Sequence, residues 1–165
     1  MLHRLVAGFA LLLLAACFPV APQVPLGPSY YVMRHLNTPQ GVQDPDLTAE
    51  GQRLAALLPG FFQDDPPRTI FVSNTKRAQQ TAEPLARALG ITPRIYDPSD
   101  TAALVRMVQA ETGGAVLVVG HSNTVPDIVE QLGGTRPAPL THPDFGDIWH
   151  ISPATGSTLK LRIDG

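Results

Sequence analysis

Two arginines and two histidines occupy three short segments whose side chains suit the binding of an anion. Arg34 and His35 follow one apolar run, Arg77 follows a second and His121 follows a third, with separations of 77 − 34 = 43 and 121 − 77 = 44 residues. Guanidinium groups bind phosphoryl oxygens through charge-assisted hydrogen bonds, and a neutral imidazole is a competent nucleophile near neutral pH. The pattern predicts a phosphoryl site if the fold brings the three segments together.

The elements that must position these residues alternate between strand and helix. The apolar runs predict strands over 30–33, 69–72, 94–96 and 115–119, with a closing hairpin of 148–152 and 158–163 around residues 154–156. Four helices are expected. The first starts at 49, and the second ends at 89, where Gly90 stops it. The third spans 101–111, and the fourth follows Asn123 and ends at 132. Thr48, Asp100 and Asn123 are expected N-caps, and the run Ser73-Asn74-Thr75 offers caps for the helix that ends at 89.

This alternation predicts an α/β domain with a mainly parallel sheet. In such a sheet ligands bind at the carboxyl ends of the strands, where all four candidate residues fall. Free N–H groups at helix N-termini would add to an anion site there. The folded part is expected over residues 29–165, long enough to bury a proper core.

Composition excludes several other classes of protein. The chain has 165 residues, 44% apolar and 16% charged, which fits one globular domain. Its net charge of −2 gives no support to nucleic-acid binding, which needs a basic face. A single cysteine excludes an intrachain disulfide and a cysteine-based zinc cluster.

Four motifs, in order, resemble the histidine phosphatase (phosphoglycerate mutase-like) superfamily. They are Val32-Met33-Arg34-His35, the run Leu47 to Gln52, the run Ser73 to Ala82, and Val118 to Ser122. The resemblance implies a three-layer α/β/α sandwich with a mainly parallel central sheet. It also implies that His35 is the nucleophile and that Arg34, Arg77 and His121 clamp the phosphate, with no metal and no cofactor.

The sequence departs from the family's Arg-His-Gly pattern at Leu36, which puts close backbone approach to the phosphate in question. Asn37 and Thr38 either donate hydrogen bonds to substrate or serve only as loop residues, and the two interpretations are about equally good. Ser122 is a further expected substrate contact.

The expected proton donor is an acidic residue some twenty to thirty positions after the second arginine, as in many relatives. Asp97 and Asp100 lie in that window, at 97 − 77 = 20 and 100 − 77 = 23. Asp97 is preferred because it directly follows a strand, whereas Asp100 is also explained as a helix N-cap.

A second polar cluster has the spacing of a metal site but is better read as a polar loop entering a strand. It consists of His142, Asp144, Asp147 and His150.

The first residues predict export and lipidation. Residues 5–16 form an apolar run too short to span a bilayer but suited to a signal peptide. Leu14-Ala15-Ala16-Cys17 resembles a bacterial lipobox, which implies a signal over 1–16, a lipidated Cys17 and a proline-rich tether over 17–28. Phe18, in place of Asp, implies the periplasmic face of the outer membrane. An ordinary secretory signal is the alternative.

Together these observations predict a membrane-tethered phosphatase that hydrolyses phosphate monoesters or phosphoramidates through a phosphohistidine. Its expected partners are a phosphorylated small molecule or phosphohistidine substrate and a membrane, with no nucleic acid. The alternatives are a lipoprotein that binds a phosphorylated ligand without turnover, and a mutase.

Overall fold

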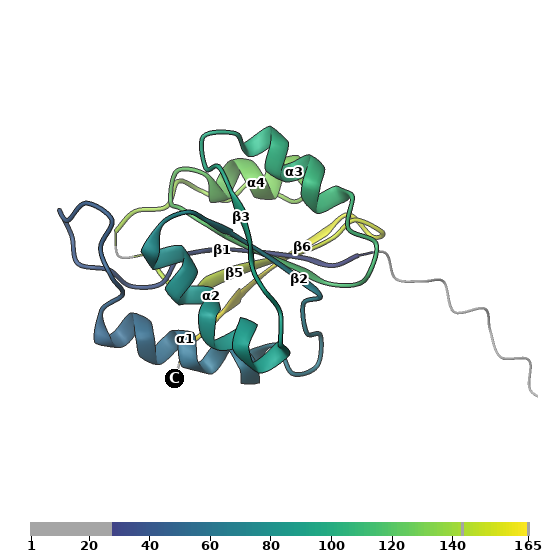
Figure 1. The fold of residues 1–165 in the computed structure, drawn as a ribbon. Helices are drawn as coiled ribbons and strands as arrows, with labels where there is room; N and C mark the ends of the chain where they lie inside the picture. The colour runs from purple at the N-terminus through teal and green to yellow at the C-terminus, as the bar shows by residue number, and fades with distance from the viewer. Residues whose placement is uncertain (1–27, 143, 165) are drawn as a thin grey trace, which may run out of the picture.

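The computed structural model describes residues 28–142 and 144–164, in which six strands form one sheet (Figure 1). The strands are β1 (Tyr30–Arg34), β2 (Thr69–Ser73), β3 (Arg94–Tyr96), β4 (Val116–Gly120), β5 (Asp147–Ser152) and β6 (Ser157–Arg162). Their order is β3-β2-β4-β1-β5-β6. The pairs β3/β2, β2/β4 and β4/β1 are parallel, whereas β5 and β6 add as an antiparallel hairpin.

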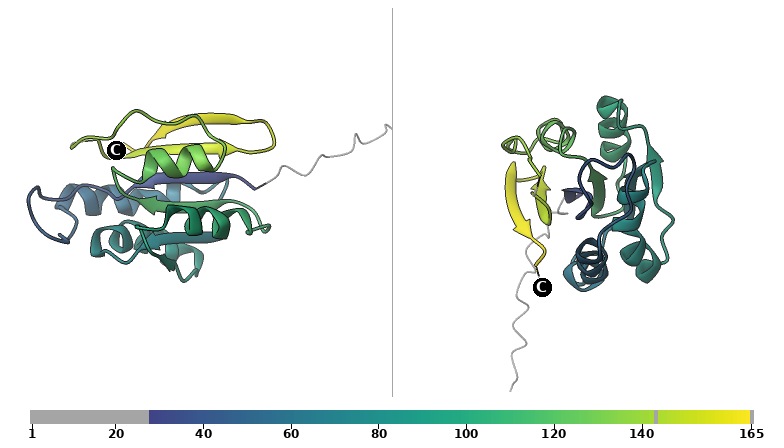
Figure 2. Two further views of the ribbon diagram at one scale, coloured as in Figure 1. Left: turned by 90° about the horizontal axis from the view of Figure 1, so that it is seen from above. Right: turned by 90° about the vertical axis from the view of Figure 1, so that its left-hand side faces the viewer.

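Helices cover both faces of the sheet, which confirms the predicted three-layer α/β/α sandwich. Helices α1 (Ala49–Phe61) and α2 (Lys76–Leu89) pack on one face, and α3 (Thr101–Gln109) and α4 (Val125–Gln131) on the other (Figures 1 and 2). Each face has its own apolar core. The central strands are buried on both faces, which explains why β4 reads as a continuous apolar run.

Most of the predicted helix ends are confirmed by hydrogen bonds. Thr48 Oγ1 accepts the N–H of Gly51 at the start of α1, and Asp100 Oδ1 accepts the N–H of Ala103 at the start of α3. Gly90 ends α2 with a φ of 66°, a conformation that glycine adopts without steric cost.

Two helix boundaries were predicted wrongly. The helix expected over 101–111 ends at Gln109, and the N–H groups of Ala110 and Glu111 close its last turn on the carbonyls of Arg106 and Val108. Asn123 is not the cap of α4, which Thr124 precedes instead. Thr124 Oγ1 accepts the N–H of His121 and the Thr124 N–H donates to the His121 carbonyl, so residues 121–124 form a turn before the helix begins.

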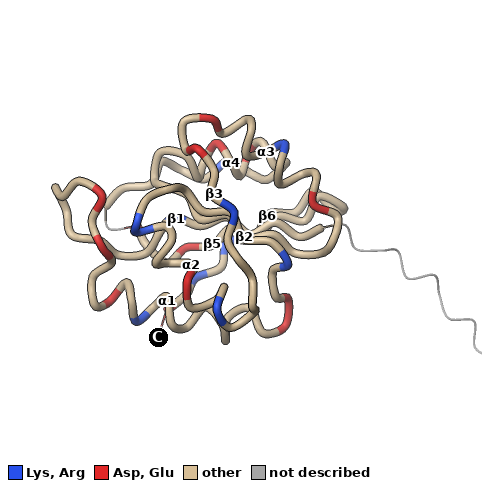
Figure 3. Tube along the Cα trace, viewed as in Figure 1, with Lys and Arg blue, Asp and Glu red and all other residues tan. Residues whose placement is uncertain are grey.

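None of the helices within residues 28–142 and 144–164 is long and apolar enough to cross a bilayer. Acidic and basic positions are interspersed along the trace in Figure 3, which fits the small net charge. The predicted signal peptide and tether lie outside the described residues, except for Pro28.

A close contact between α1 and the loop after β1 fixes that loop at the carboxyl end of the sheet. The Thr48 N–H donates to the Asn37 carbonyl (2.9 Å). Gly51, one turn into α1, packs so closely that a Cβ there would lie 2.5 Å from the same carbonyl oxygen. No residue but glycine fits this position without moving the backbone that follows His35.

We therefore predict that Gly51→Ala destabilises the fold by about 1–3 kcal/mol, the usual cost of overpacking. Gly60→Ala in the same helix is the matched control. Its new Cβ meets nothing within 4 Å, so alanine should be neutral or slightly stabilising. Urea unfolding of the two variants measures the difference, and equal midpoints would contradict the tight contact.

Candidate active site

The structure brings the four sequence-predicted residues together at the carboxyl ends of β1 and β4. The two strands are neighbours with Arg34 in register with Gly120, so His35 and His121 leave the sheet side by side. Their ring centroids are 5.4 Å apart. Arg77, in the first turn of α2, reaches the group with its Nη2 atom 3.4 Å from His121 Nδ1.

His35 is buried and held in one tautomer. Its backbone N–H donates to the Gly120 carbonyl (2.9 Å), and its Nδ1 lies 2.8 Å from the Leu36 carbonyl oxygen. A carbonyl only accepts, so Nδ1 must carry the proton and Nε2 keeps its lone pair. Burial, with Arg34, His121 and Arg77 nearby, lowers the pKa of His35 to about 3 despite the opposing Leu36 hydrogen bond. The ring is therefore neutral at physiological pH.

His121 has the opposite tautomer for the same kind of reason. The Arg77 guanidinium is a donor only, so His121 Nδ1 accepts from it and Nε2 carries the proton. Nε2 then donates to Ser73 Oγ, 2.8 Å away at the end of β2. Burial and the two arginines lower the pKa of His121 to about 4.

Arg34 is buried and fixed from two sides. Its Nη1 donates to the carbonyls of Thr141 (2.8 Å) and Asp144 (3.3 Å), and its guanidinium carbon lies 4.1 Å from the centre of the Phe145 ring. The Nε atom of Arg34 is buried without a hydrogen-bond partner among the described residues. A buried donor without a partner is costly, so this atom is a candidate for contact with a ligand.

Arg77 is fixed by both ends of its guanidinium fork. While Nη2 faces His121, Nη1 donates to Asp44 Oδ1 at 3.3 Å. The same carboxylate oxygen accepts the Lys76 N–H (3.0 Å) at the start of α2. Asp44 is the one residue other than glycine with a positive φ, 45°, in the described part of the chain.

Leu36 keeps the backbone contacts near His35 although it replaces glycine. Its side chain is fully buried in the core beneath α1 and α2. Its N–H donates to Thr81 Oγ1 (3.0 Å) while its carbonyl accepts from His35. Its φ is not positive, so a leucine is accommodated at this position without backbone strain.

The three predicted substrate contacts lie around the cluster. Asn37 anchors α1 through its carbonyl, and its buried Oδ1 has no partner among the described residues. Thr38 is buried, with its carbonyl 3.3 Å from His142 Nε2. Ser122 follows His121 in the chain and lines a hollow of about 260 Å³ with Arg136, and none of the four clustered residues lines this hollow. Their contact with substrate stays a prediction.

Asp97 does not join the cluster through any contact of the described residues. Its carboxylate is exposed and accepts the N–H and hydroxyl of Ser99 (2.9 and 2.7 Å). These bonds lower the pKa of Asp97, whereas a proton donor needs a pKa raised toward neutrality. The geometry gives no support to Asp97 as the general acid. Asp100 has its alternative role as the cap of α3.

The second polar cluster separates into unrelated contacts. The Asp144 carboxylate accepts from Thr141, Asp147 pairs with Lys160 and Arg162, and the His150 ring stacks on Tyr31 at 4.6 Å. In residues 28–142 and 144–164, no three His, Cys, Asp or Glu side chains gather as a metal site.

Three residues of the site escaped the sequence analysis. Ser73, Asp44 and Phe145 contact His121, Arg77 and Arg34 respectively. Ser73 had a detectable signal, since it ends a strand within a family motif, but it was interpreted as a helix cap. Asp44 and Phe145 lie in loops, and no periodicity indicates which way a loop residue points.

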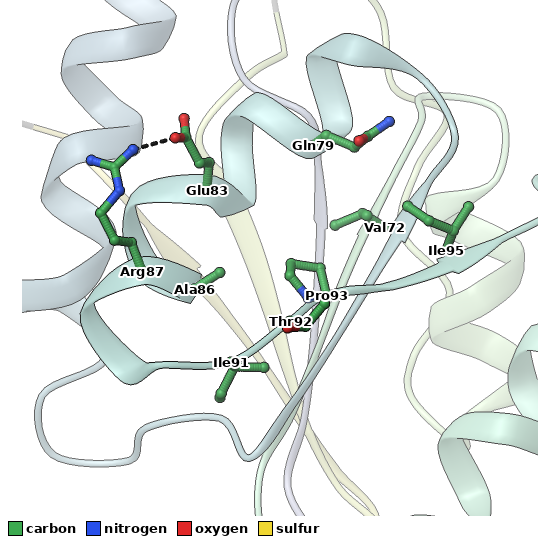
Figure 4. A pocket seen from close by; sticks show the side chains of 9 residues that line it. All are labelled: Val72, Gln79, Glu83, Ala86, Arg87, Ile91, Thr92, Pro93 and Ile95. Atoms are coloured by element: carbon green, nitrogen blue, oxygen red, sulfur yellow. Dashed lines mark hydrogen bonds and ion pairs between the residues drawn. The ribbon is translucent and has the colours of Figure 1, made fainter.

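Another hollow lies away from the cluster. It has a volume of about 400 Å³ between α2, β2 and β3, and the Glu83–Arg87 ion pair stands at its rim (Figure 4). None of the four clustered residues lines it. Its walls are mainly apolar, so it does not share the chemistry of the cluster.

Comparison with known families agrees with the motif residues. Residues 31–98 match the histidine phosphatase superfamily, branch 1. The match covers the first three of the four motifs and supports the resemblance to this superfamily over that part of the chain. The matched segment includes Arg34, His35 and Arg77, while His121 lies beyond it. No curated protein matches the chain in sequence.

Solved structures share the fold of this chain at low sequence identity. One is the protein histidine phosphatase SixA complexed with tungstate, at 19% identity and TM-score 0.62, covering 81% of this chain and 94% of that one. Another is mycobacterial glucosyl-3-phosphoglycerate phosphatase, at 14% identity and TM-score 0.62, covering 82% of this chain and 98% of that one. A third is mycobacterial hydrolase 1, at 14% identity and TM-score 0.64, covering 84% of this chain and 99% of that one.

The two buried histidines should make the fold less stable in mild acid. In the unfolded chain both histidines have a pKa near 6.5, whereas folding lowers both pKa values. As pH falls below 6.5, the unfolded state therefore binds more protons than the folded state. Stability is therefore full above pH 6.5 and decreases toward pH 4, by up to about 2 kcal/mol per histidine at pH 5.

Urea midpoints at pH 7 and pH 5 measure this effect. His121→Asn should remove about half of the difference between the two pH values, because one of the two buried rings is gone. His142→Asn, at an exposed position, is the control and should keep it. A wild-type midpoint that does not change with pH would contradict neutral burial of the pair.

Proposed function

We propose that this protein is a phosphatase that transfers the phosphoryl group of its substrate to His35 and then to water. The observation that carries the proposal is the neutral His35 ring, whose Nε2 lone pair is fixed by the Nδ1 contact with Leu36, beside two arginines. The unpartnered Nε–H of Arg34 supports it, because a phosphoryl oxygen would satisfy this buried donor.

In the first step His35 Nε2 attacks phosphorus, and the bond from phosphorus to the leaving group breaks with its electron pair on the leaving atom. Arg34 and Arg77 supply positive charge to the phosphoryl oxygens, which is the main requirement of this reaction. The product of the step is a phosphohistidine, and the Leu36 carbonyl stabilises the positive charge that develops on the ring through Nδ1–H.

In the second step water attacks phosphorus, the P–N bond breaks and its electron pair returns to Nε2. A bound phosphoryl dianion raises the pKa of His121 above its value in the empty site, since opposite charge favours the protonated ring. A protonated His121 would add a third cation to the two arginines while keeping its Nε2 bond to Ser73.

The proposed substrates are phosphate monoesters or phosphoramidates. The fold neighbours named as a protein histidine phosphatase and as a glucosyl-3-phosphoglycerate phosphatase span these two bond types. The exposed, low-pKa state of Asp97 favours substrates whose leaving group needs little protonation, such as phosphoramidates and aryl phosphates. Binding without turnover and mutase activity are the competing functions.

His35→Asn should abolish turnover, with a loss of at least about 10⁴-fold, because it removes the nucleophile of a covalent mechanism. The measurement is phosphate release by residues 26–165 from an aryl phosphate, an alkyl phosphate and phosphohistidine. Rapid quenching of the wild type should trap acid-labile, base-stable phosphate on His35. Aryl and phosphoramidate substrates should react faster than the alkyl ester.

His142→Asn is the control, since this exposed histidine lies near the cluster but outside it. Activity should survive EDTA because the arginines supply the positive charge. Loss on chelation with recovery on adding zinc or magnesium would overturn the metal-independent mechanism. Phosphate binding by a wild type that shows no turnover would favour the binding-protein alternative.

We further propose that the protein is a lipoprotein anchored through Cys17 in the cell envelope, at the periplasmic face of the outer membrane. The support is Leu14-Ala15-Ala16-Cys17 after an apolar run, with the chain's single cysteine at its end. Only Ser29 separates Pro28 from the start of β1, and Arg34 is the last residue of this strand. A tether over 17–28 could extend about 40 Å and would join the domain at the end opposite the site.

Cys17→Ser should move the full-length protein from the membrane fraction to the soluble fraction of an expressing bacterium. The reason is that several acyl chains, each methylene worth about 0.8 kcal/mol, would otherwise anchor it firmly. Intact-mass measurement of the wild type should show a processed, acylated N-terminus. An unmodified cysteine would refute the anchor and leave the phosphatase proposal intact.

A further inference from the structure

Asp44 is an anion placed against the cationic side of the candidate site, and the proposed reaction gives it no role. It lies in the exposed loop between β1 and α1, 33 residues away from Arg77 in sequence. Its carboxylate contacts the site at two points, the Arg77 guanidinium and the Lys76 N–H. Each of these groups is one that an incoming phosphoryl oxygen would also seek.

The backbone of Asp44 is held in a conformation that side-chain-bearing residues seldom adopt. Its φ of 45° is tolerated by aspartate better than by most residues, but it still has a cost. Its neighbours Pro45 and Leu47 are buried, and the Leu47 N–H donates to Gln80 Oε1 of α2 (2.8 Å). The loop is thus fixed to α2 in a way that keeps the Asp44 carboxylate at Arg77.

Charge determines what this placement does. Arg34 and Arg77 each contribute one positive charge, both histidines are neutral when the site is empty, and Asp44 contributes one negative charge. Asp44 also acts electrostatically on His121, since it partly opposes the lowering of that residue's pKa. The carboxylate therefore lowers the formal charge of these groups from +2 to +1 (2 − 1), which weakens the attraction of a phosphoryl dianion to the site.

The pair of Asp44 with Arg77 is too exposed to matter much as a structural tie. The two side chains are 42% and 21% exposed and their atoms are 3.3 Å apart, and such pairs contribute little to stability. His121 holds the other arm of the same guanidinium. Loss of the Asp44 charge should consequently leave Arg77 in place and change mainly the potential of the site.

We propose that Asp44 acts through Arg77 as an internal competitor of phosphate, and that its charge weakens the binding of the inorganic phosphate product so that it leaves. This inference rests on the proposed phosphatase function. The loop between β1 and α1 would thus control the affinity of the site for anions, while His35 carries out the chemistry.

The test is calorimetric titration of inorganic phosphate and of tungstate into residues 26–165 at pH 8 and low salt. Asp44→Asn keeps an acceptor for the Lys76 N–H but loses the charge, and it should bind both anions at least about fivefold more tightly. Asp44→Ser is a second variant that removes the charge and keeps a short polar side chain. The matched control is Asp46→Asn, since Asp46 lies in the same loop but accepts from Gln80 Nε2.

Kinetics give an independent readout. With an aryl phosphate, Asp44→Asn should lower KM and the inhibition constant of phosphate together, and the difference from wild type should shrink as salt screens the charge. A purely structural role would not produce tighter binding or a salt-dependent difference. Asp46→Asn should match wild type in every measurement.

Equal or weaker anion binding by Asp44→Asn and Asp44→Ser would overturn the inference while leaving the phosphatase proposal standing. So would a selective loss of alkyl phosphate turnover without tighter binding, which would make Asp44 a proton donor. A wild type that binds neither phosphate nor tungstate would overturn the proposed phosphoryl site itself, and this inference with it.

Discussion

The hydrogen bond from the His35 N–H to the Gly120 carbonyl continues the β1/β4 ladder one residue beyond the strands, and the site depends on it. It brings the backbone of His35 against the residue that precedes His121. His35 and His121 therefore follow the adjacent ends of two paired strands, and the backbone holds both imidazoles near the arginines. The apolar packing of β1 and β4 on both faces makes this arrangement rigid.

Burial then gives the cluster its electrostatic character. Two imidazoles and two guanidiniums share a small volume, so the histidines give up their protons rather than add to the positive charge. The result is a pair of neutral rings with defined tautomers beside two permanent cations. A dianion entering this site would meet two guanidinium cations and a His35 ring whose Nε2 is unprotonated.

The parts of the fold that local chemistry determines were predictable from the sequence. The continuous apolar run of β4, the Thr48 and Asp100 caps and the Gly90 stop each depend on neighbours within a few residues. The convergence of the arginines and histidines was predictable too, since parallel strands place their carboxyl ends together. Thr124 was missed as the α4 cap because the turn after His121 depends on a hydrogen bond to the His121 backbone.

The remaining parts of the site depend on loops that close only in three dimensions. Phe145 follows a long loop without periodicity, yet it forms the surface on which the Arg34 guanidinium rests. Asp97 had the right spacing and the right side chain. However, its carboxylate accepts two hydrogen bonds from Ser99 and is held in a local turn. Asp44 had no comparable signal and nevertheless reaches Arg77. Spacing along the chain therefore identified the arginines and histidines that follow strands. It could not identify the roles of Asp97 and Asp44, because these depend on which hydrogen-bond donors lie near each carboxylate in the folded loop.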